Sequence, residues 1–392
     1  MQKKVRLGDI ATLITKGTTP TSIGYSFVDS GINFIKIESL NDQGGFIPEK
    51  FAFINEECNA KMQRSQLREN DILFSIAGAI GKKAVVSNNI LPANTNQALA
   101  IIRIPKGKIN HQYLFYALES DEIKKQFEKQ KQGVAQLNLS LKDISELEIN
   151  LVSKEEQDKT VAVIGTVDNL IVKRKKQLQN LDELVKSRFV DMFGTINDNR
   201  FGYEIKQLQE VCKPIKDGTH QTPVYTEDSI NGYKFLSSKD VTSGTIDWNH
   251  VKYIPEVLHN ELYARITPEK GDILLAKNGT TGVAAIVDRD EIFDIYVSLA
   301  LLKPINIDTV YLWAAINSIE TKKQFDASLK GIGVPNLHLT EIRKTKIVVP
   351  PVELQEQFAI FVAQIDKSKL YVQKNLERLE MLRKSLMQKY FG

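Results

Sequence analysis

The chain has 392 residues, of which 42% are hydrophobic and 26% are charged. This length favours two or three domains, and this composition excludes a mostly disordered chain, a collagen and a coiled-coil rod. The net charge of +4, from 52 Lys and Arg against 48 Asp and Glu, permits nucleic-acid binding but does not argue for it.

We expect a cytoplasmic protein without a membrane span. No apolar run approaches the ~18 residues that mark a membrane helix, and the stretch from Met1 to Asp9 contains no apolar run of signal-peptide length. The two cysteines, Cys58 and Cys212, lie far apart and form no Cys-x-x-Cys motif, which is typical of a protein in a reducing compartment.

Residues 1–152 are predicted to form a globular domain of mixed α and β structure. The helical spacing of its apolar residues predicts a helix over Asn110–Lys129. Clusters of Gly, Asn, Pro and Ser separate short β-rich runs, which predict strands at Ile32–Ile37, Asp71–Ile76, Ala84–Val86 and Leu99–Ile104.

Residues 153–194 are predicted to form one long helix. Between Glu155 and Met192 there is no proline, and apolar residues recur in alternating steps of three and four, which is a heptad pattern. Arg174 and Arg188 interrupt this pattern. A helix of ~37 residues, ~55 Å long at 1.5 Å per residue, needs a partner for its single apolar stripe. The seam residues are Ile164, Val167, Ile171, Leu178, Leu181 and Val185.

The rest of the chain repeats the first part. Asp71-Ile72-Leu73 returns 201 residues later as Asp272-Ile273-Leu274, and Phe193-Gly194 returns 198 residues later as Phe391-Gly392. We therefore predict a tandem duplication, with a second globular domain over 203–350 and a second long helix over 351–392. Lys369 and Arg383 interrupt the second seam, which consists of Val362, Ile365, Val372, Leu376, Leu379 and Leu386.

Chain connectivity predicts how the helices pair. The second domain begins about ten residues after the first helix ends, so the second helix must run back along the first if the seams pack together. We expect a mixed α+β protein, a tandem-duplicated chain with two globular domains separated by a pair of long antiparallel coiled-coil helices with pseudo-two-fold symmetry. Phe391-Gly392 should lie near Met1, and Phe193-Gly194 near the start of the second domain.

Candidate binding residues lie in polar and basic loops at matching places in the two copies. Lys, Asn, Gln and hydroxyl side chains can read base edges and phosphates. Any one such loop is more often a solvated turn, and repetition shows common descent rather than function. The candidates are Lys16, Thr18, Thr19, Lys36, Ser75, Lys82, Lys83, Asn96 and Gln97 in the first copy, and Lys216, Thr219, His220, Gln221, Ser238, Lys239, Lys277, Asn278 and Thr280 in the second.

Sequence patterns for catalysis are missing. Gly78–Lys83 has the wrong spacing for a Walker phosphate loop, and Gly331-Ile332-Gly333 lacks the third glycine of a dinucleotide fingerprint. The five histidines form no zinc-binding pair. We therefore expect no catalytic residue, metal or cofactor in this chain, although a Ser, His and Asp set assembled only by folding would leave no such pattern.

The order of these features resembles the specificity (S) subunit of type I restriction–modification enzymes. Each motif is weak alone, and their duplicated order carries the resemblance, which covers the whole chain. Val152-Ser153 departs from Pro350-Pro351 of the second copy. The motifs are Lys16–Pro20, Lys36–Leu40, Asp71–Phe74, Gly133–Gln157 with its counterpart Pro335–Gln357, and Asp191–Gly194.

The resemblance implies a non-catalytic subunit. In this family each globular domain is a target-recognition domain that reads one half of a split double-stranded DNA site. The helices dock two methyltransferase subunits, which carry S-adenosylmethionine and methylate adenine N6. Motor–nuclease subunits that use ATP and magnesium complete the restriction complex. Because the two domains differ in their loops, the DNA site should be asymmetric.

Other interpretations stay open at this point. A scaffold of two ligand-binding modules held by a coiled coil would show no salt-dependent binding to duplex DNA. An enzyme acting alone would be active without partners. A modification system without the motor–nuclease subunits would use the same kind of S subunit, so the sequence does not separate it from a full restriction system.

Overall fold

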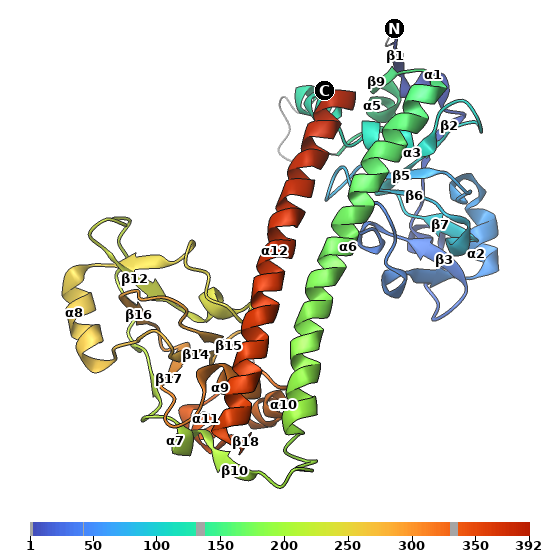
Figure 1. Cartoon of the computed structure of the whole chain (residues 1–392). Helices are drawn as coiled ribbons and strands as arrows, with labels where there is room; N and C mark the ends of the chain where they lie inside the picture. Colours follow the sequence, from blue (N-terminus) through green and yellow to red (C-terminus); the bar gives the residue numbers. More distant parts are fainter. Residues whose placement is uncertain (1–2, 42, 131–137, 330–335) are drawn as a thin grey trace. The chain divides into compact units, whose positions relative to one another are not determined.

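The computed structural model describes residues 3–41, 43–130, 138–329 and 336–392 (Figure 1). They form two compact units, which we call unit 1 (Met1–Arg174 with Asn375–Gly392) and unit 2 (Lys175–Lys374). Each unit contains one globular part and one half of each long helix. Met1, the Gly133-to-Leu137 part of the first motif, Gly331-Ile332-Gly333 and Pro335 lie outside the described residues.

Unit 1 contains three small sheets, with strand orders β1-β9, β2-β8-β5-β6 and β4-β3-β7. All neighbouring strands are antiparallel except β3 and β7, which are parallel. Its elements are β1 (Lys3–Arg6), α1 (Leu7–Ile10), β2 (Leu13–Lys16), β3 (Ile32–Ile35), β4 (Ala52–Ile54), α2 (Glu56–Lys61), β5 (Ile72–Ser75), β6 (Lys83–Val85), β7 (Ala93–Thr95), β8 (Leu99–Arg103), α3 (His111–Ala117), α4 (Asp121–Gln130), α5 (Leu141–Glu146), β9 (Glu148–Leu151) and the first part of α6 (Lys154–Phe193).

Unit 2 repeats this topology, with strand orders β10-β18, β11-β17-β14-β15 and β13-β12-β16, which confirms the duplication at the level of the fold. Its elements are β10 (Glu204–Gln207), α7 (Leu208–Val211), β11 (Lys216–Asp217), β12 (Tyr233–Leu236), β13 (Lys252–Ile254), α8 (Glu256–Arg265), β14 (Ile273–Ala276), β15 (Ala284–Ile286), β16 (Phe293–Ile295), β17 (Leu299–Leu302), α9 (Thr309–Ile316), α10 (Ile319–Ser328), α11 (Leu339–Lys344), β18 (Lys346–Val349) and the first part of α12 (Val352–Phe391).

The predicted strands are present with slightly shifted ends, but the predicted helix over Asn110–Lys129 is wrong in one respect. It is broken into α3 and α4, separated by Leu118, Glu119 and Ser120. The Ser120 hydroxyl accepts the backbone N–H of Ile123 at 3.4 Å, so it caps a new helix instead of continuing the old one. The apolar spacing continues across the break, so the sequence pattern did not reveal that the helix is interrupted.

A buried glutamine explains the repeated Glu-x-Gln motif at the start of each long helix. In unit 1 the side chain of Gln157 accepts the backbone N–H of Asn110 at 2.9 Å and donates to the carbonyl of Val152 at 2.9 Å. In unit 2 Gln355 accepts from Asp308 at 2.8 Å and donates to Pro350 at 2.7 Å. The same side chain thus fixes the turn before the long helix, whether that turn contains Val152 or proline.

The two long helices, each 40 residues, are antiparallel in unit 2. Asp182 of α6 forms an ion pair with Lys369 of α12 at 2.5 Å. Further along α6, the ring of Phe189 lies 5.6 Å from that of Phe358. Residue numbers rise along one helix as they fall along the other, as the connectivity predicted.

Unit 1 shows the same antiparallel relationship at the opposite ends of the helices. Arg383 of α12 donates to Asp168 of α6 at 2.6 Å. Phe391, at the end of α12, and Ile164, in the first turns of α6, belong to one buried cluster that also includes residues of the globular part. Val5 of β1 packs against the same cluster, so the end of α12 and the first described strand share one core.

The predicted seam is largely buried. Four of its members, Leu178, Leu181, Leu379 and Leu386, are half-buried. The other eight are buried, namely Ile164, Val167, Ile171, Val185, Val362, Ile365, Val372 and Leu376. Among the described residues no helix is long and apolar enough to cross a membrane.

Candidate nucleic-acid interface

The predicted loops of unit 1 meet at one edge of its sheets. Strands β2 and β5 end there, and β6 and β8 begin there, because neighbouring strands of this sheet are antiparallel. The parallel strands β3 and β7 also end there, with Ile35 opposite Thr95. We call this the loop edge of unit 1; it consists of Lys16–Thr19, Lys36, Ser75–Lys82 and Asn96-Gln97.

Unit 2 has a matching edge. Thr219 donates its backbone N–H to the carbonyl of Ile295 at 3.1 Å, and Val297 donates to that of Thr219 at 3.0 Å. The N–H of Ser238 reaches the hydroxyl of Ser298 at 3.0 Å, and Lys277 bonds through its backbone to the same residue at 2.8 Å. The loop edge of unit 2 consists of Lys216–Gln221, Ser238-Lys239, Lys277–Gly282 and Tyr296–Ser298.

A glycine makes the close approach possible in both edges. A Cβ atom on Gly17 would lie 1.7 Å from the carbonyl oxygen of Thr95, and one on Gly218 would lie 1.9 Å from that of Ile295. No side chain fits at such distances, so only glycine lets these two backbone segments touch. The sequence identified these glycines as loop residues, but not the segment that each one contacts.

Not all candidate side chains are available on the surface. Ser75 is fully buried, and its hydroxyl donates to the carbonyl of Ala79, inside the loop. Lys83 is 9% exposed and paired with Glu119 at 3.3 Å, and Lys277 is 5% exposed and paired with Asp217 at 2.5 Å. These three side chains hold the edges together in this structure, and a role in DNA contact stays a prediction for them.

Half-buried candidates take part in local contacts. Thr19 donates to the side chain of Gln97, the side chain of Asn96 accepts the N–H of Ala98, and the ammonium of Lys36 lies 4.9 Å from the ring centre of Phe27. Thr18, Lys82, Ser238 and Asn278 are also half-buried, and Thr219 is buried with its hydroxyl accepting from Gln221. The exposed candidates are Lys16, Gln97, Lys216, His220, Gln221, Lys239 and Thr280.

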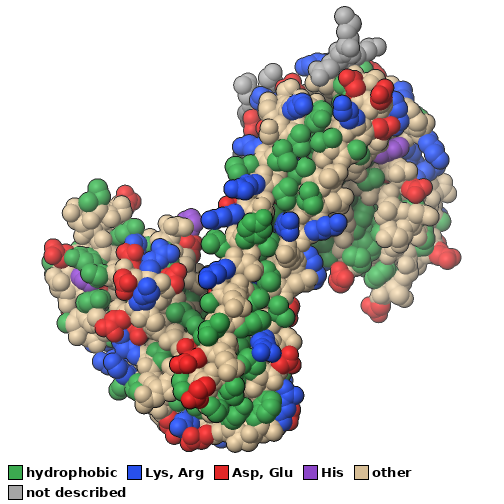
Figure 2. Space-filling view, viewed as in Figure 1, with side chains coloured by type: hydrophobic (Ala, Val, Ile, Leu, Met, Phe, Trp, Pro, Cys, Tyr) green, Lys and Arg blue, Asp and Glu red, His purple; other side chains and the backbone are tan. Residues whose placement is uncertain are grey.

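The electrostatic character of the surface is mixed. In the space-filling view, basic side chains lie over the long helices and both units, interspersed with acidic and hydrophobic ones (Figure 2). Asp217 of unit 2 offsets the positive charge of Lys277 at its edge, and its carboxylate also lies 3.4 Å from the imidazole of His220. Within the described part of the chain, no three His, Cys, Asp or Glu side chains gather to hold a metal.

Sequence reasoning missed several residues that shape these edges. Arg265 donates to the backbone carbonyl of Asp217 at 3.1 Å, while Lys216 donates to the carbonyl of Arg265 at 3.2 Å. Glu119 and Arg383 form an ion pair at 2.7 Å that adjoins Lys83. The only signal for Arg383 was that a charged residue interrupts an apolar heptad seam.

These observations define a duplicated α+β protein with two loop edges and a pair of long helices. The chain belongs to the family described as the type I restriction modification DNA specificity domain, whose model matches residues 2–181 and again residues 202–381. This family membership establishes DNA sequence specificity, within type I restriction–modification, as the general role of the chain.

Two specificity subunits illustrate the similarity. The chain is 28% identical over 410 residues to the type I restriction enzyme MjaVIII specificity subunit of Methanocaldococcus jannaschii, covering 98% of this chain and 90% of that protein. It is 32% identical over 155 residues to the type I restriction enzyme EcoBI specificity subunit of Escherichia coli, covering 39% of this chain and 32% of that protein.

Solved structures support the fold. A chain from a type I restriction–modification structure on complex assembly and conformational transition matches with a TM-score of 0.61 at 18% identity, covering 100% of this chain and 97% of the other. The S subunit of a type I system from M. genitalium matches with a TM-score of 0.53 at 15% identity, covering 100% and 96%.

Proposed function

We propose that this chain is the non-catalytic subunit that selects the DNA site of a type I restriction–modification complex. One observation carries the proposal. The same loop edge is built twice on the same topology, but with different side chains, such as Gln97 in one edge and Ser298 in the other. Base readout depends on such local side chains. Each unit therefore reads its own half of an asymmetric, bipartite double-stranded site.

The exposed members of the edges are the proposed DNA contacts. Lys16, Lys216 and Lys239 contact phosphates, since an ammonium is a point charge that positions a protein on the backbone. Gln97, His220, Gln221 and Thr280 carry the donors and acceptors that can distinguish bases. The buried Ser75, Lys83 and Lys277 serve these contacts indirectly by holding the loops.

The proposed partners supply the chemistry. Two methyltransferase subunits dock on the long helices and carry S-adenosylmethionine for transfer to adenine N6, and motor–nuclease subunits using ATP and magnesium join them for restriction. The chain itself binds no cofactor in this proposal. Since its target is DNA, it acts in the cytoplasm.

Methylome mapping tests this function. The chain is expressed with its methyltransferase partner in cells, and methylated adenines are located by single-molecule sequencing. The expected result is one bipartite motif with two unlike halves. Replacing residues 1–152 by the same domain of a relative should change one half of the motif and leave the other, and replacing residues 203–350 should do the reverse.

Two outcomes would contradict the proposal. If a single swap changes both halves together, one composite surface reads the DNA. If no motif appears and the purified complex shows no salt-dependent binding to duplex DNA, the chain is a scaffold for other ligands, because binding through phosphates necessarily weakens with salt.

A further inference from the structure

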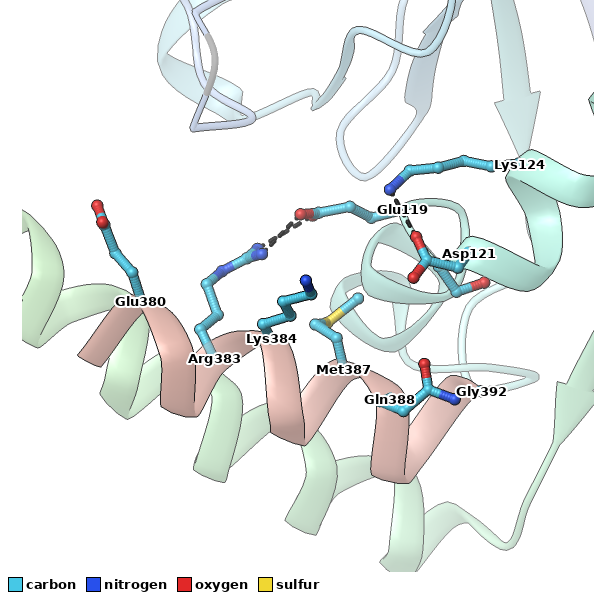
Figure 3. A pocket seen from close by; sticks show the side chains of 10 residues that line it. Glu119, Asp121, Lys124, Glu380, Arg383, Lys384, Met387, Gln388 and Gly392 are labelled. Carbon is cyan, nitrogen blue, oxygen red and sulfur yellow. Dashed lines mark hydrogen bonds and ion pairs between the residues drawn. The ribbon is translucent and has the colours of Figure 1, made fainter. Parts of the chain in front are cut away.

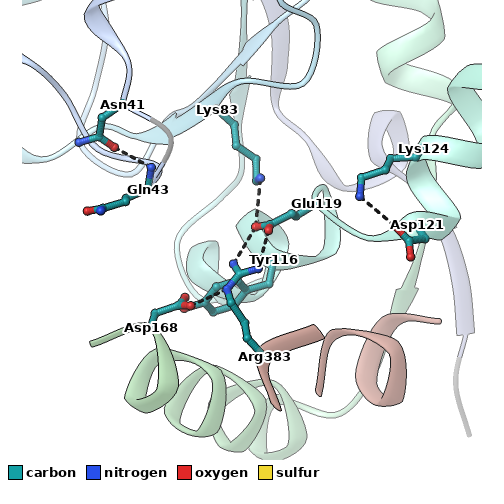
Figure 4. Close-up of polar contacts among 9 residues, drawn as sticks. All are labelled: Asn41, Gln43, Lys83, Tyr116, Glu119, Asp121, Lys124, Asp168 and Arg383. Atoms are coloured by element: carbon teal, nitrogen blue, oxygen red, sulfur yellow. Dashed lines mark hydrogen bonds and ion pairs between the residues drawn. The ribbon is translucent and has the colours of Figure 1, made fainter. Parts of the chain in front are cut away.

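A chain of charged side chains links a loop of unit 1 to both long helices (Figure 4). Lys83 lies 3.3 Å from one carboxylate oxygen of Glu119. Arg383 of α12 donates to the other oxygen of Glu119 at 2.7 Å and to Asp168 of α6 at 2.6 Å. The hydroxyl of Tyr116 completes the group by donating to Asp168 at 2.9 Å.

Lys83, the first residue of this charged group, directly follows the Ser75–Lys82 loop. Lys83 is the first residue of β6, and the backbone N–H of Ser75 binds the carbonyl of Lys82 at 2.8 Å. The N–H of Gly81 binds the carbonyl of Ser75 at 3.2 Å. The loop is therefore fixed to the strand ends, and the Lys83 side chain connects those strand ends to Glu119.

Glu119 lies in the turn between α3 and α4, where its backbone N–H donates to the carbonyl of Tyr116 at 3.0 Å. From this turn its side chain points toward Arg383 and Lys83 (Figure 4). Its exposed fraction is 29%, and that of the Arg383 side chain is 25%.

The charges of this group depend on one another. Burial lowers the pKa of Lys83, although the carboxylate of Glu119 opposes that shift. Burial alone would raise the pKa of Glu119, but hydrogen bonds from Arg383 and the charge of Lys83 bring it below its ordinary value. Removing the carboxylate of Glu119 or the guanidinium of Arg383 would leave a partly buried charge without its partner, which is costly.

In unit 2 the matching strand and turn are linked without charges. The repeat places Ala284 where unit 1 has Lys83, Asn317 where it has Glu119, and Val185 where it has Arg383. Asn317 accepts the N–H of Ala284 at 3.0 Å and donates to its carbonyl at 3.0 Å. Val185 is buried in the apolar core. Since Asn317 contacts the strand backbone directly, no ionic connection is needed there.

We propose that Glu119 and Arg383 are positioning residues for target recognition by unit 1. They hold Lys83, and through it the Ser75–Lys82 loop, in a fixed place relative to α6 and α12. The inference rests on the function proposed above. Recognition of the unit 1 half-site, but not of the other, would then depend on Arg383, which lies near the end of the chain and more than 260 positions from Glu119.

The test uses the complete complex with its methyltransferase subunits. After methylome mapping and the swap of residues 1–152 have assigned the halves of the motif, methyl transfer is measured on duplexes with single-base changes in each half. For Glu119→Gln and for Arg383→Lys, discrimination in kcat/KM against wrong bases should fall roughly tenfold, the factor that about 1.4 kcal/mol represents. This loss should occur at the unit 1 half and not at the unit 2 half.

Glu119 and Arg383 line a pocket of about 380 Å³, and Asp121 on the wall of this pocket offers a matched control (Figure 3). Asp121 forms an ion pair with Lys124 at 2.8 Å, but both side chains are more than half exposed and neither pairs with Lys83. Asp121→Asn should leave discrimination at both halves unchanged. If Glu119 and Arg383 had only a structural role, their variants would reduce activity on every duplex by the same factor.

The outcomes separate the two proposals. The positioning role is overturned if both variants discriminate against wrong bases as well as wild type does. It is also overturned if they lose discrimination equally at both halves. If the wild-type complex methylates no bipartite site, the proposed function fails, and the positioning role fails with it. Should Glu119→Gln not assemble, Arg383→Lys, which keeps the positive charge, still decides the question.

Discussion

The ring of Phe391 packs against that of Tyr113, with centroids 5.0 Å apart, and in the other unit Phe193 packs against Tyr311 at 4.8 Å. In each pair the phenylalanine ends one copy of the repeat, and the tyrosine belongs to the globular part of the other copy. All four side chains are buried. The core of each unit is therefore completed by the helix end of the opposite copy.

This relationship predicts a large loss of stability for Phe391→Ala. Removing a buried aromatic ring costs about 3–5 kcal/mol, because the lost contacts and the remaining cavity add up. Chemical unfolding followed by far-ultraviolet circular dichroism measures the loss. Met381→Ala, at a side chain of α12 that is 64% exposed, is the control and should cost little. Equal midpoints for both variants would mean that the end of α12 does not support the core.

A second prediction concerns a polar pair that differs between the units. In unit 2, Nδ1 of His259 lies 2.7 Å from Oδ2 of Asp294, and the imidazole stacks on Tyr233 with centroids 3.7 Å apart. In unit 1 the corresponding strand and helix carry Asn94 and Asn59, whose side chains hydrogen-bond at 2.9 Å. A neutral amide pair thus occupies the place of an ionisable one.

We expect His259→Asn alone to destabilise unit 2 by about 1–3 kcal/mol, because the shorter amide loses the stacking on Tyr233 and the hydrogen bond that the imidazole makes to the buried carboxylate. The double variant with Asp294→Asn should recover most of this loss, since it recreates the amide pair of unit 1. Trp248 and Trp313, the two tryptophans of the chain, both lie in unit 2, so their fluorescence during urea unfolding measures this unit. Additive effects of the two substitutions would contradict the pairing.

Asp294 also predicts a dependence on pH. Burial raises its pKa above the ordinary 3.8, although hydrogen bonding and the charge of His259 oppose this shift, and Oδ1 has no hydrogen-bond partner among the described residues. Because the folded-state pKa is raised, the stability contributed by the carboxyl is complete below about 3.8 and is lost as pH rises through the folded value. Relative to Asp294→Asn, wild type should therefore lose stability from acid toward neutral pH. The free energy of unfolding in urea, measured at several pH values, tests this, and the same pH dependence in both proteins would refute it.

The repeated Asp-Ile-Leu motif predicts a further stability effect. Asp71, 1% exposed, receives two hydrogen bonds from Arg103 at 2.7 Å each, and its counterpart Asp272 pairs with Lys303 at 2.7 Å. Arg103→Met should cost about 3–5 kcal/mol, since a buried carboxylate loses its partner. Thermal unfolding measures the change. Asp71→Asn combined with Arg103→Met should be less damaging than Arg103→Met alone, and a more damaging double variant would argue against an ion pair.

The loop edge of unit 1 gives a prediction for DNA binding. Lys16 is exposed at the end of β2, and if it contacts a phosphate, Lys16→Ala should weaken binding about equally on all sequences and reduce the salt slope by roughly one. Fluorescence anisotropy of the complex on labelled duplexes at several salt concentrations measures both. Lys142→Ala, at an 81% exposed side chain on α5, is the control. An unchanged salt slope would remove Lys16 from the interface.

Patterns along the chain were enough to predict the duplication, the class of fold and the long helices. Periodic patterns of side chains carry this information, because a heptad seam and a repeated order of strands can be recognised from the order of residues along the chain. Connectivity added the antiparallel pairing, since a short link after Phe193 leaves the second helix no other direction. The grouping of the loops into one edge was only partly within reach. Ser75–Lys82 and Asn96-Gln97 lie beside strands that the pattern had identified, but Lys16–Thr19 lies at the end of β2, which it had not.

Which candidate side chains are exposed and which are buried could be seen only in the folded chain. Lys83 and Lys277 read as basic loop residues in the sequence, but each is buried beside a carboxylate, and those partners, Glu119 and Asp217, lie 36 and 60 positions away in the chain. The ion pair of Glu119 with Arg383 joins residues 264 positions apart. No local pattern records such a contact, because its energy depends on burial and on geometry that exist only after the strands, the broken helix and the end of α12 have packed together.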